Sequence, residues 1–158
     1  MDDLYHKYLE SAVHFLSYRA RSEKEVRDNL AKKKADPQMI DRVVTWLKEQ
    51  RFLNDADFAK QWMESRARSK PKSLKLIVAE LRQKGVTQEI IDSVVADPET
   101  ELGSDKDRAE KIARKKYPKY KHLPRQELYQ KLGGVLARQG FNWETIKSSI
   151  DEILRDRV

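Results

Sequence analysis

The side chains of this chain that could do chemistry are cations gathered in two stretches with few acids. Residues 66–84 hold seven lysines or arginines and one acid, and residues 106–125 hold nine cations and two acids. Tyr117 and Tyr120 lie in the second stretch and could stack on bases, although the spacing of Tyr117 favours the core. Clustered cations in a chain of net charge +7 suit phosphates or acidic protein surfaces. The pattern predicts a polyanionic partner.

The helix dipole offers a structural alternative, because it favours cations at helix C-termini. That effect accounts for one or two cations in each cluster, but not for a run such as Arg114-Lys115-Lys116. Arg19 and Arg21 look like the equivalents of Arg66 and Arg68 in an earlier copy of the same pattern. We therefore predict a basic ridge that binds a polyanion or a partner protein. Its members are Arg19, Arg21, Arg66, Arg68, Lys70, Lys72, Lys75, Lys111, Arg114, Lys115 and Lys116.

Other kinds of functional site find no support in the sequence. The chain has no cysteine, its three histidines lack ligand spacing, and phosphate-loop, dinucleotide and zinc-protease motifs are missing. We expect no enzymatic activity, no metal and no cofactor. The first residues are acidic and lack the apolar stretch of a signal peptide, and no apolar run approaches the roughly 20 residues of a membrane span. We therefore expect a cytoplasmic protein.

A pattern centred on residues 65–95 recurs on both sides of that stretch. The run Arg-Ala-Arg-Ser stands at 66–69 and at 19–22, and Ile-Asp-x-Val-Val stands at 91–95 and at 40–44. A weaker copy spans residues 109–150. Three copies at a period of about 50 residues indicate a tandem array of one supersecondary unit.

Apolar residues at helical spacing predict three helices in each copy, and polar residues mark where they begin. Ser22 with Glu25 fits a capping box, and Asp36 precedes a proline at the first helical position. Asn54 or Asp55 is expected to cap the fourth helix. Thr87 and Asn142 are expected to cap the sixth and ninth helices. Gly85 and Gly140 are expected to end the fifth and eighth helices in the left-handed conformation.

Several expectations concern less regular positions. Lys34 stands where the other copies have glycine, so the second helix is expected to end differently. Leu4 and Val95 are expected to be buried, and Phe52 with Leu53 is expected to dock between the first two copies. A basic loop is expected between Pro118 and Pro124.

The organisation predicted from these signals is three small units with one linker. The units span residues 1–53, 54–97 and 106–158, and residues 98–105 form an acidic hinge that contains Pro and Gly. No coiled-coil heptad run favours a dimer, so we expect a monomer.

The joint pattern resembles the RecX family of bacterial regulators of the RecA recombinase. The matching residues are RSEKEVRDNL at 21–30, RFLND at 51–55 with Phe58, Ala59 and Trp62, and RARSKPKSLKLIVAELRQKGV at 66–86. The family usually has a glycine near Ser73, which this chain lacks.

The resemblance implies an all-α fold of three tandem three-helix, helix-turn-helix-like units in an elongated, curved array. It also implies binding to RecA and to the RecA filament on single-stranded DNA. The expected result is mainly inhibition, through blocked filament growth and reduced strand exchange, ATP hydrolysis and coprotease activity. The family offers no catalytic residues.

A non-specific DNA-binding helical module is the alternative function. Three-helix units with basic segments resemble helix-turn-helix domains. However, the third helices of the second and third units are neutral or acidic, which disfavours sequence-specific reading of the major groove. Direct contact with DNA therefore stays open.

Overall fold

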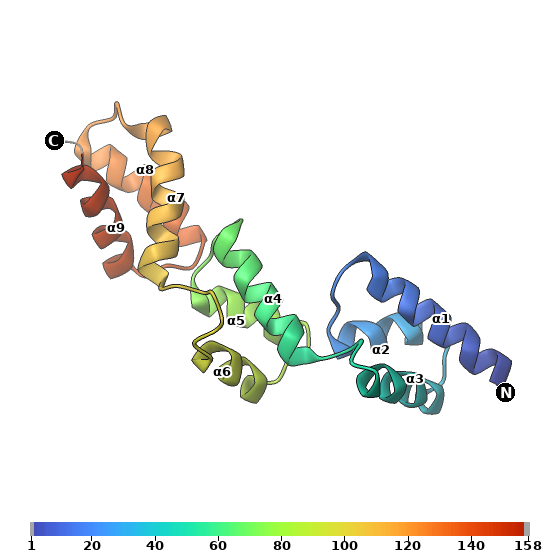
Figure 1. Cartoon of the computed structure of the whole chain (residues 1–158). Coiled ribbons are helices and arrows are strands. Elements are labelled where there is room, and N and C mark those ends of the chain that lie inside the picture. Colours follow the sequence, from blue (N-terminus) through green and yellow to red (C-terminus); the bar gives the residue numbers. More distant parts are fainter. Residues whose placement is uncertain (1, 157–158) are drawn as a thin grey trace. The chain divides into compact units, whose positions relative to one another are not determined.

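The computed structural model describes residues 2–156, in which nine α-helices and no strands are found. The helices follow one another in three groups of three (Figure 1). This arrangement confirms the all-α fold of tandem three-helix repeats. The helices are α1 (Asp2–Tyr18), α2 (Glu23–Lys32), α3 (Pro37–Glu49), α4 (Asp55–Arg68), α5 (Leu74–Gln83), α6 (Gln88–Ala96), α7 (Asp105–Tyr120), α8 (Arg125–Arg138) and α9 (Trp143–Arg155).

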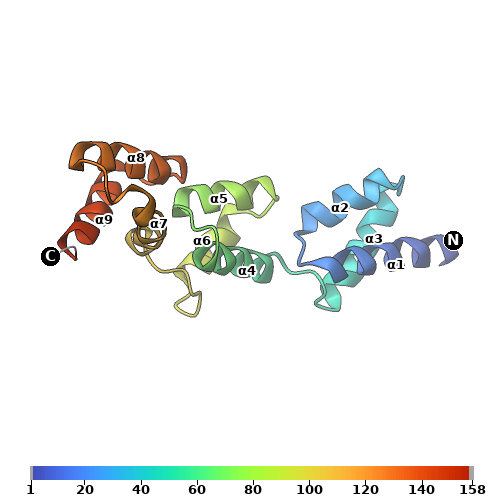
Figure 2. The same cartoon turned by 90° about the horizontal axis from the view of Figure 1, so that it is seen from above.

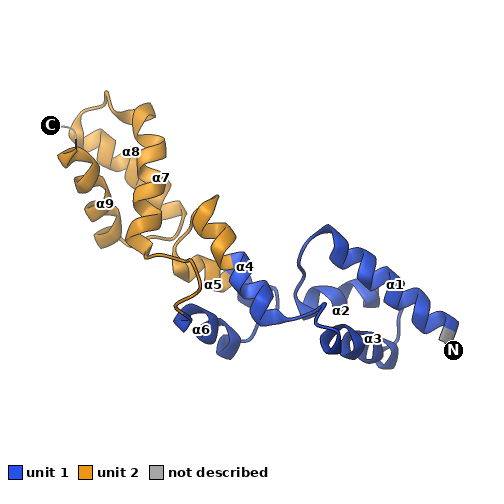
Figure 3. Cartoon of the chain, in the orientation of Figure 1, with its two compact units in different colours: residues 1–62, 80–97 blue, residues 63–79, 98–158 orange. Residues whose placement is uncertain are grey.

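The chain divides into two compact units, which Figure 3 shows in different colours. The first unit comprises residues 1–62 and 80–97, and the second comprises residues 63–79 and 98–158. Helix α4 therefore begins in the first unit and ends in the second, and α5 does the reverse. Among residues 2–156, no helix is both long enough and apolar enough to cross a bilayer.

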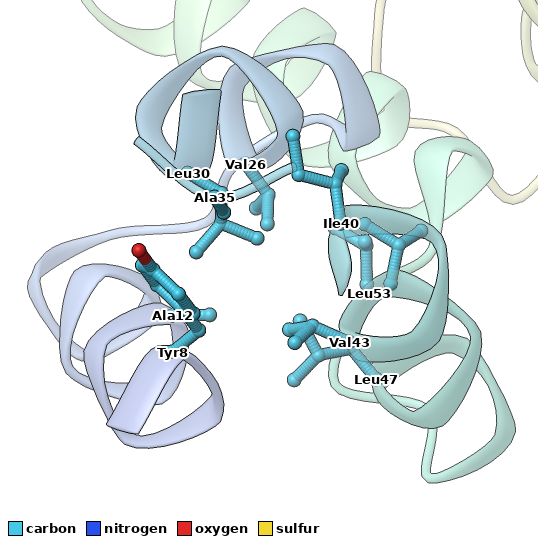
Figure 4. Close-up of a cluster of buried hydrophobic side chains, with 10 residues drawn as sticks. Tyr8, Ala12, Val26, Leu30, Ala35, Ile40, Val43, Leu47 and Leu53 are labelled. Atoms are coloured by element: carbon cyan, nitrogen blue, oxygen red, sulfur yellow. The ribbon is translucent and has the colours of Figure 1, made fainter. Parts of the chain in front are cut away.

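The core of the first unit lies among α1, α2 and α3 (Figure 4). Helix α1 contributes Tyr8 and Ala12, and α2 contributes Val26 and Leu30, each pair being four residues apart and so on one face of its helix. The Tyr8 hydroxyl donates a hydrogen bond to the Lys33 carbonyl at 3.1 Å. The remaining buried members are Ala35, Ile40, Val43, Val44, Leu47 and Leu53.

The core of the second unit lies among α7, α8 and α9, whose packing is seen from above in Figure 2. Its buried members recur at helical spacing, as expected for an amphipathic face. They are Ala109, Ile112, Ala113, Leu128, Leu132, Leu136, Phe141, Ile146, Ile150 and Ile153. The predicted core positions of the middle helices are also buried at Phe58, Ala59, Met63, Ile77, Leu81, Ile91 and Val94.

The predicted helix starts are confirmed. Ser22 forms the capping box with Glu25, and Asp36, Thr87 and Asn142 each accept a hydrogen bond from the third amide of their helix. At α4 the cap is Asn54, whose Oδ1 accepts from the Asp57 amide at 3.1 Å.

Three predicted burials are wrong. Leu4, Phe52 and Val95 are 48%, 57% and 36% exposed, whereas Leu53 is buried as expected. Phe52 lies beside the ring of Trp46, with centroids 5.8 Å apart. Its aromatic neighbour covers part of the ring, and the rest faces outward.

The basic loop predicted between Pro118 and Pro124 is also wrong in its first half, because α7 continues through Pro118 to Tyr120. A proline in the helix interior removes the hydrogen bond to the carbonyl four residues earlier and crowds that carbonyl, but Pro118 lies in the last turn, where little helix remains to be disturbed. Tyr117 and Tyr120 contact the core of the second unit and hold this turn in place. Lys119 therefore lies on a helix and not in a loop.

The second helix of each repeat ends in the same way. Lys34, Gly85 and Gly140 have φ of +74°, +84° and +90°. In each case the amide that follows donates to a carbonyl five residues earlier: Ala35 to Leu30, Val86 to Leu81, and Phe141 to Leu136. This is the Schellman arrangement. The prediction that α2 ends differently is wrong, since Lys34 adopts the glycine conformation.

In the first unit, the second helix of one repeat is joined to the first helix of the next. Ser22 is fully buried, and its Oγ donates to the Lys84 carbonyl at 2.6 Å. The amide of Glu23 donates to Oδ1 of Asp55 at 2.8 Å. The first turn of α2 is thus satisfied by the first residue of α4 as well as by its own N-cap.

The second unit repeats this joint with different residues. Ser73 is buried at the start of α5, and its amide donates to the Gln139 carbonyl at 3.0 Å. The amide of Leu74 donates to Oδ1 of Asp105 at 2.9 Å. Asp105 begins α7 as Asp55 begins α4, so the bond from the first helical amide to an aspartate occurs twice, whereas the serine uses its hydroxyl in the first joint and its amide in the second.

Both joints need glycine for a second reason besides backbone conformation. A Cβ at Gly85 would lie 2.5 Å from the Lys24 Cβ, and a Cβ at Gly140 would lie 2.5 Å from the Leu76 Cγ. Lys34 is exposed and lies against no such helix start. Position 34 therefore tolerates a side chain at the cost of its backbone strain alone.

Replacing Lys34 with glycine should relieve that strain and stabilise the first unit by about 1 kcal/mol. The melting temperature should rise by about 2–4 °C in a thermal scan followed by circular dichroism. Lys32→Gly, inside the same helix, should lower it by a similar amount. An unchanged or lower melting temperature for Lys34→Gly would contradict the role given to its backbone.

The carboxylate of Asp55 should be replaceable by a neutral acceptor. Burial, together with the charges of Glu23 and Glu25, raises the pKa of Asp55 despite the hydrogen bond from the Glu23 amide. A carboxyl whose folded pKa is raised stabilises the fold below its unfolded pKa, and this contribution is lost as the pH rises through the folded pKa.

Asp55→Asn should therefore match or exceed the wild-type free energy of unfolding at neutral pH, with the gain disappearing in acid. Asp55→Ala removes the acceptor and should cost about 0.5–2 kcal/mol. Urea unfolding at neutral and acid pH measures both. Equal losses in the two variants would show that the charge itself is needed.

Candidate partner-binding groove

The predicted ridge residues of the first unit are engaged by a carboxylate. Arg19 Nη2 lies 2.6 Å from Glu25 Oε2, and Arg21 Nη1 lies 4.0 Å from the same oxygen. The Arg21 guanidinium also lies 3.9 Å above the centre of the Phe15 ring. Burial by itself would raise the pKa of Glu25, but hydrogen bonds from Arg19 and the Ser22 amide outweigh it and leave the pKa lowered. These cations are used inside the first unit.

Two ridge residues of α7 are also used within their own unit. Lys111 Nζ donates to the carbonyls of Ala67 and Arg68 at 3.2 and 2.7 Å, and so caps the end of α4. Arg114 Nη2 lies 2.8 Å from a carboxylate oxygen of Asp156. Lys111 therefore has the structural role considered above, in which a cation bonds the free carbonyls at the C-terminus of a helix.

Four other ridge residues come together around one hollow of the second unit. Lys70 and Lys72 come from the turn before α5, and Lys115 and Lys116 come from α7. The hollow has a volume of about 320 Å³. Pro71, Ile112, Val135 and Gln139 complete its lining. We call these eight residues the cationic groove.

Helical spacing explains how α7 and α8 present the groove. Lys115 and Lys116 follow Ile112 by three and four residues, so all three share one face of α7. Val135 lies in the last turn of α8, and Gln139 is the residue that caps the C-terminus of this helix, four residues later. Ile112 is only 8% exposed and belongs to the core. The groove therefore has an aliphatic base connected to the core and cations around it.

The turn that carries Lys70 and Lys72 is fixed by its neighbours. Lys70 has φ of +52°, a left-handed conformation that is strained for a lysine. The carbonyl of Lys72 accepts from Arg108 Nε at 2.8 Å. Immediately after it, the Ser73 amide is bonded to the Gln139 carbonyl at 3.0 Å. The second joint therefore holds this turn beside α7 and α8.

Three of the four lysines of the groove are not neutralised by carboxylates. No aspartate or glutamate occurs in residues 65–79, 111–126 or 128–143, the segments from which the groove is built. Within residues 2–156, Lys70, Lys115 and Lys116 make no ion pair, and all three are exposed. Several like charges close together raise the local positive potential and favour an anionic ligand.

The other predicted ridge residues lie outside the groove. Arg68 and Lys75 are exposed, whereas Arg66 is half-buried and engaged by other groups. The N-cap serines also change the alignment of the repeats. Counting from Ser22 and Ser73, Arg19 and Arg21 correspond to Lys70 and Lys72, and not to Arg66 and Arg68 as the shared run Arg-Ala-Arg-Ser suggested.

Arg108 is the structural residue of this site that the sequence analysis missed. Its side chain is 3% exposed. Besides the Lys72 carbonyl, it donates to the carbonyls of Leu102 and Gly103 and to Oδ1 of Asp105. Its spacing was the available signal, because Arg108 stands four residues before Ile112 on the buried face of α7.

The described residues do not form a cluster of metal ligands. Residues 2–156 contain no group of three or more His, Asp or Glu side chains that could hold a metal ion. The groove offers lysine ammonium groups, one side-chain amide and aliphatic carbon. Such a set can bind an anion or an acidic surface.

Arg108→Ala should destabilise the second unit by about 3 kcal/mol or more, because it leaves several carbonyls and Asp105 without their buried donor. Arg114→Ala removes an exposed pair of the same helix and should cost less than about 1 kcal/mol. Urea unfolding measures both free energies. Similar values for the two variants would overturn the role assigned to Arg108.

Comparison with known proteins gives a consistent family assignment. Models of the first, second and third three-helix domains of RecX match residues 9–47, 54–95 and 104–150. Regulatory protein RecX of Bacillus subtilis is 34% identical over 148 residues, covering 93% of this chain and 55% of the relative. That of Listeria monocytogenes is 34% identical over 152 residues, covering 95% and 55%. The chain thus spans about half the length of the curated relatives it matches.

Solved structures support the fold. The crystal structure of RecX from Lactobacillus salivarius matches with a TM-score of 0.80 at 24% identity, and each chain is covered completely. A second crystal structure, of a regulatory protein RecX, matches with a TM-score of 0.73 at 23% identity, covering 95% of this chain and 73% of that one. The three domain models, in order along most of the sequence, show that this chain belongs to the RecX family.

Proposed function

We propose that this protein regulates the RecA recombinase, mainly as an inhibitor. It binds RecA and the RecA filament on single-stranded DNA and blocks filament growth, with loss of strand exchange, ATP hydrolysis and coprotease activity. Membership of the RecX family and relatives named regulatory protein RecX support this function. It acts by binding and not by catalysis, in the cytoplasm, as a monomer.

The observation that carries the proposal is the cationic groove. Lys70, Lys115 and Lys116 keep their charge unpaired around an aliphatic base. Internal use explains Arg19, Arg21 and Lys111 but leaves these three lysines without a structural task. Exposed charges that stabilise nothing in their own fold are available to a partner.

Tandem repeats suit a partner that is itself a repeating filament. Each repeat is too small to bury a large surface, but linked contacts add through effective concentration. Residues 98–105 remain our proposed hinge between such contacts. In the described fold, the Glu101 amide is bonded to Glu64 at 2.9 Å, and Arg108 holds the carbonyls of Leu102 and Gly103. Motion of the hinge would have to break these bonds or carry them along.

A non-specific DNA-binding module is the second candidate, and the acid-free segments around the groove favour it. Direct phosphate binding weakens with salt at a log–log slope of roughly −0.7 to −0.9 for each phosphate neutralised. A steep slope for oligonucleotide binding without RecA would support this function. A flat slope with retained inhibition would favour RecA contacts.

The central test is ATP hydrolysis by RecA on single-stranded DNA, with this protein well below the RecA concentration. The wild-type chain should inhibit strongly. Lys115→Glu/Lys116→Glu should raise the half-inhibitory concentration roughly tenfold or more, since it reverses two charges of the groove.

The matched control is Lys7→Glu/Lys131→Glu. It changes the net charge equally at two exposed lysines outside the groove, and inhibition should be retained. Absence of inhibition by the wild-type chain would refute the proposed function, and equal effects of the two double variants would refute the role of the groove.

A further inference from the structure

The cationic groove combines two features that one class of ligand would use together. Lys70 and Lys72 reach it from the turn before α5, while Lys115 and Lys116 reach it from α7. Pro71, Ile112 and Val135 also line the hollow, and their side chains offer only carbon to a ligand. A ligand that fits has an apolar group for the base and negative charges on either side.

The size of the hollow limits what enters it. Its volume of about 320 Å³ lies at the lower end of the range of about 300–1,000 Å³ for sites that enclose small molecules. One or two side chains fill such a space. The Gln139 side chain, with an amide donor and an acceptor, can bond the backbone of an extended segment.

A single-stranded nucleic acid would not make use of both the lysines and the aliphatic side chains of the groove. Single strands are held by aromatic side chains on which bases stack, together with cations for the phosphates. The groove is lined by no aromatic residue. Tyr117 and Tyr120, the nearest in sequence, instead contact the core of the second unit. Phosphates would occupy the lysines but leave the aliphatic base exposed.

We propose that the cationic groove binds an acidic peptide segment carrying an aliphatic side chain, presented by the partner protein. The aliphatic side chain lies on Ile112 and Val135, and flanking carboxylates pair with the lysines. Burying the aliphatic group supplies the affinity, and the charges select the segment. This inference rests on the proposed function only in placing the segment on the regulated partner.

The experiment uses fluorescence anisotropy with the whole chain and three labelled probes at low salt. The first probe is a peptide that contains Asp-Glu-Leu-Glu-Asp, and the second has serine in place of the leucine. The third is an oligothymidylate. The leucine peptide should bind at least about fivefold more tightly than the serine peptide, because only it covers the base of the groove.

Variants connect this difference to the groove. Val135→Ser, at a half-buried position, should remove the preference for leucine and leave the serine peptide unaffected. Lys115→Glu/Lys116→Glu should weaken both peptides roughly tenfold or more, whereas Lys7→Glu/Lys131→Glu should not. Circular dichroism of each variant confirms that it is folded.

Two results would overturn the inference. One is equal binding of the two peptides. The other is preferred binding of the oligothymidylate that is lost in Lys115→Glu/Lys116→Glu but unchanged in Val135→Ser, which would assign the groove to nucleic acid. The assay contains no RecA, so its failure leaves the inhibition test intact. Peptide binding without inhibition of RecA would refute the proposed function alone.

Discussion

The bond between an aspartate and the first turn of a neighbouring helix is the interaction on which the rest of this structure depends. Asp55 and Asp105 each receive the first amide of the preceding repeat's second helix, beside a buried N-cap serine. A buried helix start without partners is costly, so a single repeat cannot bury this end by itself. The joint makes burial possible. It also explains the two compact units, because each contains one outer repeat and the parts of the middle repeat that its joint holds.

One difference between the joints accounts for the different state of the cations beside them. The third residue of α2 is Glu25, which completes the capping box and draws in Arg19 and Arg21. The corresponding third residue of α5 is Leu76. Helix α5 therefore has no carboxylate at this position that could pair with Lys70, which stands where the first joint has Arg19. The shared bond between an aspartate and a helix start is thus accompanied by a closed ionic cluster in the first unit and by an open cationic groove in the second.

The sequence predicted what depends on local chemistry. Helix caps, glycine stops and repeat spacing are set by a few neighbouring residues, so Ser22, Asp36 and Gly85 were placed correctly. The exposure of Phe52 and the helical course through Pro118 depend on which surfaces meet in the fold, and spacing alone does not show that. The spacing of Arg108 signals its burial, but the carbonyl groups that it binds come from segments outside α7 and cannot be read from the sequence. The shared run Arg-Ala-Arg-Ser led to a wrong alignment of the first two repeats. The correct alignment follows the N-cap serines Ser22 and Ser73, which that run does not place at equivalent positions. Of the predicted ridge, the sequence identified the cations but could not show which had partners.

Some cations of the predicted ridge are paired with groups of their own fold, and others are left for a ligand. A basic ridge drawn along the sequence treats all its members alike, yet Lys111 caps α4, Arg114 pairs with Asp156, and Arg19 pairs with Glu25. Charges already compensated in this way contribute little to the attraction of a ligand, because their fields are largely cancelled at short range. Lys70, Lys115 and Lys116 have no such compensation and stand over aliphatic carbon. The groove of the second unit therefore combines uncompensated positive charge with apolar side chains. A surface of this kind selects a ligand by shape as well as by charge, which a uniformly basic ridge would not do.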